Sequence, residues 1–350
     1  MSAEGEGPSQ PRMRRSPEFE LITAIRERMA ATVAGSARAA TIRIGIGDDA
    51  AVTEPGGATA TTIDALVDGV HFRSSWCPPR VVGRKALAAA ASDLAAMGAE
   101  PGEAYVWLGA PPDLGEAPIL ELCDGLASLA EDLGIAVLGG DLTAAAVLSV
   151  AVTAVGHAAS ASELAGRDGA EPGHALCVTG ELGGAAAGLM LLEHPELREQ
   201  VSEETAAAAI ARQLDPRPRL DAGGALAAAG AAAMIDVSDG LGADAEHLAA
   251  ASGTGAEIEL ERVPVGAGVT EVAAASGRDV VDLVAAGGED YELLCAIPRS
   301  ALDRCARAVE RSGSRLTEIG RFTGGGGSVR LRLAGGRSLP ASGHDHLRPR

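Results

Sequence analysis

Two aspartates lie three residues apart in the segment IDVSDGL, residues 235–241, where an apolar run gives way to a helix-like pattern. No lysine or arginine lies beside Asp236 and Asp239, although neighbouring carboxylates repel one another and need a compensating cation. Either water screens the two side chains at the surface, or a metal ion lies between them.

Acidic residues recur beside glycines at the ends of other strand-like segments. LGGDLT places Gly140 and Asp141 at such an end, GGEDYELL places Glu289 after two glycines, and Asp64 closes a further strand-like stretch. Open α/β sheets bind ligands outside their strand ends. Carboxylate oxygens select Mg²⁺, Mn²⁺ or Ca²⁺ over zinc, so the pattern indicates a site for one of these cations.

Asp93 lies in the middle of a predicted helix, flanked by alanines in AAAASDLAAMG. A buried and unpaired carboxylate there is costly, so Asp93 needs either solvent or a cation. Lys85 lies two helical turns earlier and could form one end of a charged face. A solvated helix face is the alternative interpretation of Asp93, and a structural role is the alternative for the lone His71.

The segment GIGDDA, residues 45–50, matches the pattern G-x-G-x-x-A of dinucleotide-binding turns. That interpretation fails because Asp48 and Asp49 would set negative charge against a pyrophosphate, and a strand-like segment follows in place of a helix. Two interpretations remain: a surface turn, or a glycine-rich loop that presents carboxylates to a metal. The four glycines at 324–327 are typical of a hairpin loop.

The composition bounds the class of protein. The 350 residues suffice for two domains, whose cores must be mainly aliphatic because aromatic residues make up only 2%. A net charge of −19 argues against nucleic acid or an anionic membrane as partner, and no apolar run of about 18 residues predicts a membrane span. Five cysteines without a CxxC pair favour free thiols in a reducing cytoplasm.

Two common ATP-binding devices are excluded by the lysine count. Of the 29 basic residues only Lys85 is a lysine, and Ala86 follows it. A Walker A loop requires lysine followed by Ser or Thr, and protein kinases require a lysine on a particular strand.

The predicted elements alternate between helices and strands, as in an α/β protein, and a linker is predicted at 158–173. Before the linker we predict helices at 19–35, 79–101 and 118–134, and strands at 41–52, 59–72, 105–111, 135–143 and 148–158. After it we predict helices at 183–194, 203–214 and 299–312, and a hairpin at 328–339.

The chain resembles the thiamine-monophosphate kinase family in seven segments that occur in the same order: GIGDDAAV, TIDALVDGVHF, KALAAAASDLAAMGAEP, GGDLT, AGRDGAEPG, IDVSDGL and GGEDYELL. The family belongs to the aminoimidazole ribonucleotide synthetase-like superfamily. The resemblance runs from about residue 18 to the C-terminus. It implies a two-domain α/β (α+β) architecture: an N-terminal ATP- and metal-binding domain at 18–157 that dimerises through its strands, and a C-terminal domain at 158–350. Residues 1–17 are expected to form a disordered tail, because they are rich in Gly, Pro, Ser and Arg and lack an apolar segment.

The resemblance also implies an activity. The expected reaction is phosphorylation of thiamine monophosphate to thiamine diphosphate by ATP, through direct in-line transfer assisted by several Mg²⁺ ions. The expected protein is a cytoplasmic homodimer without a catalytic nucleophile, because metal-assisted phosphoryl transfer requires none.

The resemblance assigns roles to particular residues of this chain. The implied metal ligands are Asp49, Thr62, Asp64, Asp93, Asp141, Asp236 and Asp239, with Asp48 as a supporting neighbour. The implied ATP contacts are Gly140, Asp141, Arg167 and Ser238, and the implied substrate contacts are His71, Glu289 and His344.

Two positions depart from the family pattern. Ile63 replaces the usual hydroxyl residue before Asp64, which leaves only its backbone carbonyl for a metal contact. His344 stands where members carry Trp or Tyr, and so offers a smaller ring for stacking on the substrate. The alternatives are another ATP-using enzyme of the superfamily, or a non-catalytic protein that binds nucleotide or metal.

Overall fold

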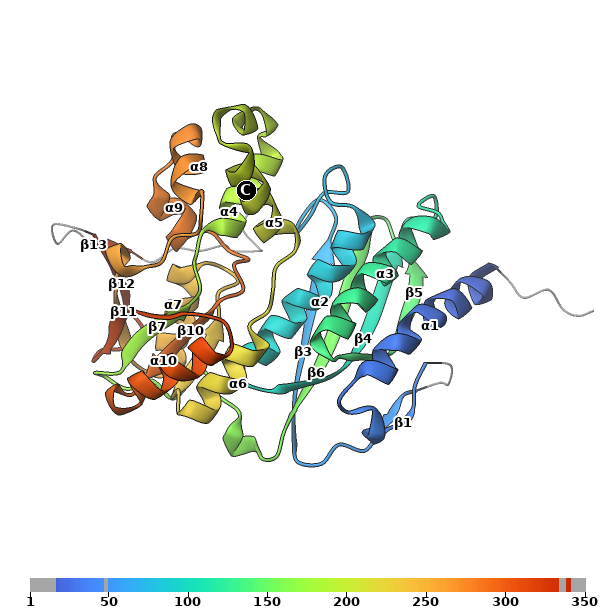
Figure 1. Ribbon diagram of the computed structural model, residues 1–350, viewed down its shortest axis with the longest axis horizontal. Coiled ribbons are helices and arrows are strands. Elements are labelled where there is room, and N and C mark those ends of the chain that lie inside the picture. The colour runs from blue at the N-terminus through green and yellow to red at the C-terminus, as the bar shows by residue number, and fades with distance from the viewer. Residues whose placement is uncertain (1–16, 47–49, 334–337, 341–350) are drawn as a thin grey trace, which may run out of the picture.

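The computed structural model describes residues 17–46, 50–333 and 338–340. Its first half is built on a four-stranded sheet with the strand order β3-β6-β4-β5 (Figure 1). The pairs β3–β6 and β6–β4 are antiparallel, and β4–β5 is parallel. The strands are β3 (Ala58–Val67), β4 (Glu100–Ala110), β5 (Ala136–Ala144) and β6 (Ser149–Ala158), and a separate two-stranded sheet joins β1 (Ile42–Ile44) to β2 (Val52–Thr53).

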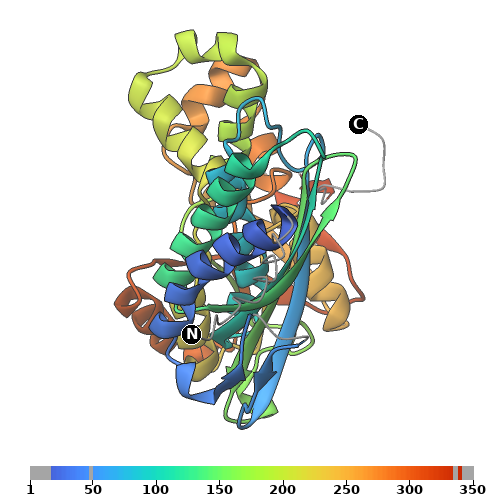
Figure 2. The ribbon, with the colours of Figure 1, turned by 90° about the vertical axis from the view of Figure 1, so that its right-hand side faces the viewer.

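Helices α1 (Pro17–Gly35), α2 (Pro79–Ala96) and α3 (Glu116–Leu133) lie on one face of this sheet (Figure 2). Side chains along a strand alternate between the two faces. Thr62 and Asp64 of β3 therefore face the helices, whereas Ile63 faces the open side and is 69% exposed. Trp107 of β4 is also exposed. The sheet thus has one covered face and one open face with apolar side chains.

The second half is built on a seven-stranded sheet with the strand order β13-β12-β9-β11-β7-β10-β8. All of its pairs are antiparallel except β12–β9. Its strands are β7 (Ala175–Thr179), β8 (Ala233–Asp236), β9 (Gly255–Glu259), β10 (Leu293–Ile297), β11 (Leu316–Thr323), β12 (Val329–Arg332) and β13 (Ser338–Pro340).

Successive residues of the central strands contribute to two different cores. Cys177 and Cys295 belong to a core shared with α2, α6 (Leu220–Ala229) and α10 (Leu302–Arg311). Val178 and Leu294 belong to a second core with α7 (Leu241–Ala251). The first core also contains the covered face of the four-stranded sheet, so one continuous apolar cluster joins the two halves.

Four further helices form the projection at the top of Figure 1. These are α4 (Gly184–Glu193), α5 (Glu203–Leu214), α8 (Val269–Ser276) and α9 (Val280–Ala285). Apolar residues of α4, α8 and α9 reach into the second core, so this group of helices is anchored to the seven-stranded sheet.

The predicted α/β class is confirmed, and the hairpin at 328–339 is the antiparallel pair β12–β13. The segment at 41–52, whose strand-like alternation breaks at Gly45 to Gly47 and then resumes in the sequence, forms two short paired strands, β1 and β2. Helices α6 and α8 and strand β11 were not predicted. The tail predicted at 1–17 lies outside the described residues, apart from Pro17, where α1 begins. All five cysteines are buried free thiols, and no helix in the described ranges is long and apolar enough to cross a membrane.

Gly83 allows helices α2 and α3 to approach closely. A Cβ atom at this position would lie 2.0 Å from the carbonyl oxygen of Leu122. We expect Gly83→Ala to lower the free energy of unfolding by about 1–3 kcal/mol, because the backbone of α3 must move away. Gly224→Ala in α6 is the control. A Cβ atom at this position meets no atom within 4 Å, so the substitution should raise the free energy of unfolding by about 0.5–1 kcal/mol. Urea unfolding measures both, and equal effects of the two variants would contradict the close helix contact.

Candidate active site

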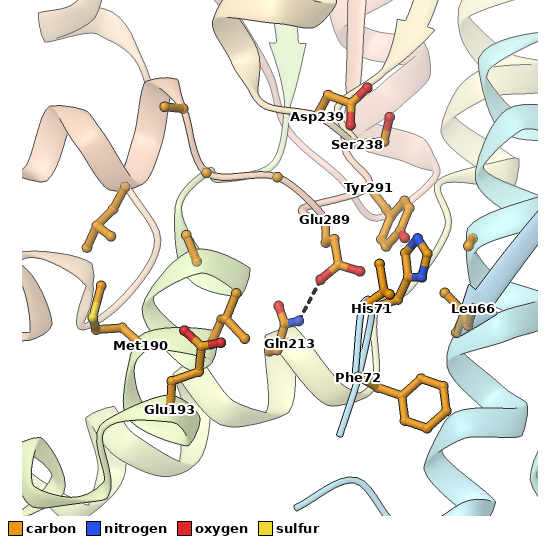
Figure 3. Close-up of a pocket in the computed structure, with 18 of the residues that line it drawn as sticks. Leu66, His71, Phe72, Met190, Glu193, Gln213, Ser238, Asp239, Glu289 and Tyr291 are labelled. Carbon is orange, nitrogen blue, oxygen red and sulfur yellow. Dashed lines mark hydrogen bonds between the residues drawn. The ribbon is translucent and has the colours of Figure 1, made fainter. Parts of the chain in front are cut away.

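A cavity of about 710 Å³ lies between the two halves of the molecule (Figure 3). The first half contributes the end of β3, the following segment and one face of α2. The second half contributes helices α4, α5 and α9 and the two segments at 236–239 and 286–291. Residues from these elements include Asp64, His71, Asp93, Gln213, Asp236, Ser238, Asp239 and Glu289.

Asp236 is a buried carboxylate at the floor of this cavity, at the end of β8. Ser92 of α2 donates a hydrogen bond from its Oγ to Oδ2 of Asp236 at 2.7 Å, which joins the two halves. The pKa of Asp236 is raised from 3.8 to about 7, chiefly by burial and also by the charges of Asp93 and Asp64, against the opposing effects of Ser92 and Arg167. The three carboxylates therefore lie close enough to repel one another.

Asp93 and Asp64 reach the cavity from neighbouring elements of the first half. The hydroxyl of Thr62 on β3 donates a hydrogen bond to Oδ2 of Asp93 on α2, which fixes the direction of that carboxylate. Ile63 lies between Thr62 and Asp64, and its side chain points to the open face of the sheet. The solvated-face interpretation of Asp93 is wrong, because this side chain lines the cavity and influences a buried carboxylate.

Asp244 holds the loop that carries Ser238 and Asp239. Its Oδ2 accepts hydrogen bonds from the backbone N–H groups of Ser238, Asp239 and Gly240, each at 3.1 Å. Burial raises the pKa of Asp244 to about 8, and the charges of Asp236 and Asp239 add to this rise. The N–H groups at the start of α7 are thus already paired within the chain.

The acids of GGEDYELL have separate tasks. Glu289 and Tyr291 line the cavity together with Gly287 and Gly288. Glu289 and Tyr291 have positive φ angles, 65° and 50°. Gly288 permits this turn, because a Cβ there would lie 2.2 Å from the carbonyl oxygen of Ser238. Oε2 of Glu289 accepts hydrogen bonds from Lys85 Nζ at 3.0 Å and Gln213 Nε2 at 2.6 Å. Lys85 is fully buried and pairs with an acid of the second half, so the charged face predicted for α2 lies inside the protein.

Glu292, the last acid of the segment, is fully buried and holds two arginines away from the cavity. Arg219 donates from Nε at 2.8 Å and from Nη2 at 2.5 Å, and Arg212 donates from Nη2 at 3.1 Å. The hydroxyl of Thr179 adds a hydrogen bond at 2.8 Å. This cluster of charges is structural.

Asp290 caps the N-terminus of α4. Gly183 N–H donates to Oδ2 at 2.6 Å and Ala185 N–H donates to Oδ1 at 3.1 Å. Burial raises the pKa of Asp290 from 3.8 to about 6, against the effect of these two hydrogen bonds. The Asp290 carboxylate consequently binds a proton more tightly in the folded state than in the unfolded state.

A pH dependence of stability follows from Asp290. Because its pKa is higher in the folded state, the free energy of unfolding should fall as pH rises from about 4 to 6, by roughly 1.4 kcal/mol per pH unit. Asp290→Asn should remove this contribution, while Asp303→Asn on the exposed side of α10 should not. Urea unfolding at pH 4, 5 and 6 measures the slope, and an unchanged slope in Asp290→Asn would contradict the assignment.

The other predicted site residues are placed as follows. Arg167 lies within the segment predicted as a linker, and its charge lowers the pKa of Asp236, so it lies near the carboxylates. His71 lines the cavity, and its Nδ1 accepts a hydrogen bond from Val67 N–H at 3.1 Å. Gly140 and Asp141 lie on β5, three strand spacings from β3 or about 14 Å away, and are not brought to the cavity within this chain. Asp48, Asp49 and His344 lie outside the described residues.

Three supporting residues were not predicted from the sequence, and of these Gln213 lines the cavity. Ser92 holds Asp236, Gln213 holds Glu289, and Asp244 holds the loop at 238–240. A signal existed for Ser92, because it lies seven residues after Lys85 and therefore on the same face of α2. Asp244 lies in the first turn of its helix, where carboxylates pair with free N–H groups.

The donor set at the cavity floor fits a hard divalent cation. All the donors are oxygens, and a cation among Asp64, Asp93 and Asp236 would reverse the repulsion that raises the pKa of Asp236. In the parts of the chain that the structure describes, no three His, Cys, Asp or Glu side chains form a complete metal-holding group. The metal assignments therefore remain predictions.

Two family models together match most of the chain. Residues 47–158 match the family described as AIR synthase related protein, N-terminal domain, and residues 171–332 match AIR synthase related protein, C-terminal domain. Thiamine-monophosphate kinase of Mycobacterium tuberculosis is 40% identical over 271 residues, which cover 75% of this chain and 77% of that protein.

Solved structures are similar over nearly the whole chain. The crystal structure of thiamine-monophosphate kinase from Stenotrophomonas maltophilia K279a has a TM-score of 0.78 at 34% identity, covering 91% of this chain and 97% of that one. AaThiL complexed with AMPPCP and TMP has a TM-score of 0.72 at 30% identity, covering 95% and 99%.

Proposed function

The chain belongs to the thiamine-monophosphate kinase family of AIR synthase related proteins, and on that premise we propose that it phosphorylates thiamine monophosphate to thiamine diphosphate with ATP. One observation carries the proposal: Asp64 and Asp93 of the first half meet Asp236 of the second half in one cavity. Transfer between two anionic substrates requires charge neutralisation and positioning, which such a cluster supplies with bound cations.

The proposed metal is Mg²⁺. Its ligands would be Asp64, Asp93, Asp236 and Asp239, together with Asp49. When bound, the ions neutralise the phosphate oxygens and orient them for a direct in-line displacement. The hydroxyls of Thr62 and Ser92 orient Asp93 and Asp236, so these two contribute through the carboxylates that they hold.

The phosphates of ATP must be held by cations more than by helix N-termini. Asp244 occupies the N–H groups before α7, and Asp290 occupies those at the start of α4. We therefore assign an ATP phosphate contact to Arg167, whose charge acts on Asp236. Ser238 would contribute its hydroxyl, since its backbone N–H is already bonded.

The rest of the cavity suits the thiamine moiety. Val70, Trp76, Leu189, Met190 and Leu283 line it with apolar surface for the two rings. Glu289 supplies negative charge near the positively charged thiazolium ring, and His71 lies opposite it (Figure 3). These contacts favour a cationic aromatic substrate that also carries a phosphate.

We propose a homodimer formed through the open face of the four-stranded sheet. Ile63 and Trp107 expose apolar surface on this face, and Asp141, which pairs with Trp107 across the β4–β5 ladder, lies beside them. A second copy covering the face would bury this surface and bring Gly140 and Asp141 into or next to the interface. The five free thiols are consistent with our proposal of a cytoplasmic location.

The test of the proposed function is direct. The purified protein is incubated with ATP, Mg²⁺ and thiamine monophosphate, and thiamine diphosphate is quantified by chromatography. We expect turnover that stops when EDTA removes the cation, and little product with free thiamine, because the acceptor must bring its own phosphate to the metals. Equal turnover of thiamine and thiamine monophosphate, or ATP consumption without either product, would overturn the assignment.

A further inference from the structure

Three side chains, two from helices and one from a loop, form a buried polar network beside the cavity. Lys85 of α2 contacts Glu289, and Glu289 contacts Gln213 of α5. Lys85 and Gln213 are 0% and 1% exposed. This polar network therefore runs from the interior of the first half to the cavity wall formed by the second half.

One atom of this polar network has no hydrogen-bond partner among the described residues. Gln213 uses its Nε2 for Glu289, while its Oε1 is buried and receives no hydrogen bond from any described residue. Gln213 lines the cavity, and its amide oxygen points away from Glu289 (Figure 3). A buried acceptor without a donor is unfavourable, and such atoms are rare in folded proteins.

The orientation of the amide follows from its neighbours. An ionised carboxylate can only accept hydrogen bonds, so a rotated Gln213 would set its oxygen against Oε2 of Glu289. The buried ammonium of Lys85 lies 3.0 Å from the same Oε2 and forms an ion pair with it. Lys85 and Glu289 together keep the Gln213 oxygen toward the cavity.

We propose that Gln213 is a specificity-determining residue whose Oε1 accepts a hydrogen bond from an N–H group on the ring system of the substrate. The inference rests on the proposed function, which identifies that donor. Thiamine monophosphate carries one amine, on its pyrimidine ring, and its remaining polar groups are ring nitrogens and the phosphate. The amine of the substrate is therefore the group that donates a hydrogen bond to the unpartnered Oε1 of Gln213.

The experiment measures the kinetics of two enzymes, each with two substrates. The enzymes are wild type and Gln213→Leu, and the substrates are thiamine monophosphate and its analogue with hydrogen in place of the pyrimidine amine. For wild type we expect kcat/KM to fall roughly tenfold to a hundredfold when the amine is absent. Gln213→Leu should show the same fall with the natural substrate, mainly in KM, and should process the two substrates equally. The KM for ATP should not change.

Arg84→Met is the matched control. Arg84 lies next to Lys85 and makes a cross-half ion pair with Asp215, at 2.7 Å, outside the cavity lining. This variant should lose stability without losing discrimination between the substrates. Gln213→Leu should melt close to wild type, because it removes an unpaired acceptor and leaves Glu289 its lysine.

The outcomes separate the two proposals. If wild type does not phosphorylate thiamine monophosphate, the proposed function itself is wrong. If it does, but Gln213→Leu slows both substrates by the same factor or changes neither, Gln213 is structural and the inference is overturned. Should Gln213→Leu fail to fold, wild type alone decides: equal kcat/KM for the two substrates would overturn the inference.

Discussion

Replacing Asp93 with asparagine is expected to lower the turnover of thiamine monophosphate by roughly a thousandfold while raising the melting temperature in chelator. Asparagine keeps the size of the side chain and can still accept the hydrogen bond from Thr62. It removes the charge that raises the pKa of buried Asp236, so repulsion in the metal-free protein decreases. The same lost charge weakens the proposed Mg²⁺ site, on which transfer depends.

Two measurements check this expectation. Turnover is followed by product chromatography, and thermal melting is followed in EDTA and again with Mg²⁺ and nucleotide. The shift produced by Mg²⁺ and nucleotide should be smaller in Asp93→Asn, because stabilisation by a ligand follows its affinity for the folded state. Asp132→Asn on the exposed side of α3 should leave all three quantities unchanged. Near-normal turnover with a full ligand shift would remove Asp93 from the site.

Arg219→Met should be the most destabilising single substitution considered for this chain. The variant loses both hydrogen bonds from Arg219 to Glu292 and leaves a fully buried carboxylate to Arg212 and Thr179. Breaking a buried ion pair by removing one partner costs about 3–5 kcal/mol. Arg332→Met, which breaks an exposed pair with Glu257, should change stability by less than about 1 kcal/mol.

Urea unfolding distinguishes the buried pair from the exposed one. Adding Glu292→Gln to Arg219→Met should recover part of the lost stability, because the uncompensated charge is then removed. If Arg219→Met costs no more than Arg332→Met, or if the second substitution only adds to the loss, Glu292 is not the buried charge that the structure describes.

Sequence patterns predicted the elements with clean periodicity and missed the others for identifiable reasons. Helix α6 reads LDAGGALAAA, and its two adjacent glycines argue against a helix; yet Gly223 is needed, since a Cβ there would lie 2.0 Å from the Ala95 carbonyl oxygen. Strand β11 was missed because a bulge between Glu318 and Gly320 breaks the alternation of its side chains. Both features arise from tertiary contacts, which local patterns do not contain.

The candidate site was predictable where charge patterns are local and not where partners come from distant segments. Asp93 and Asp236 stood out because each lies in an apolar context without a nearby cation. Gln213 carried no signal: its partner Glu289 lies 76 positions later in the chain. Conversely, Asp290, which caps a helix, and Glu292, which pairs with arginines, lie in the same segment as Glu289, and no local pattern separates the three roles.

The alanine-rich helix α2 has a consequence for how the enzyme acquires its ligands. Its backbone lies close to that of α3 at Gly83 and to that of α6 at Gly223. The same helix carries Lys85, Ser92 and Asp93, which reach both halves. Movement of one half against the other about the cavity would have to break these contacts. The entropic cost of assembling the carboxylates is met when the chain folds, and the substrates encounter a preorganised site.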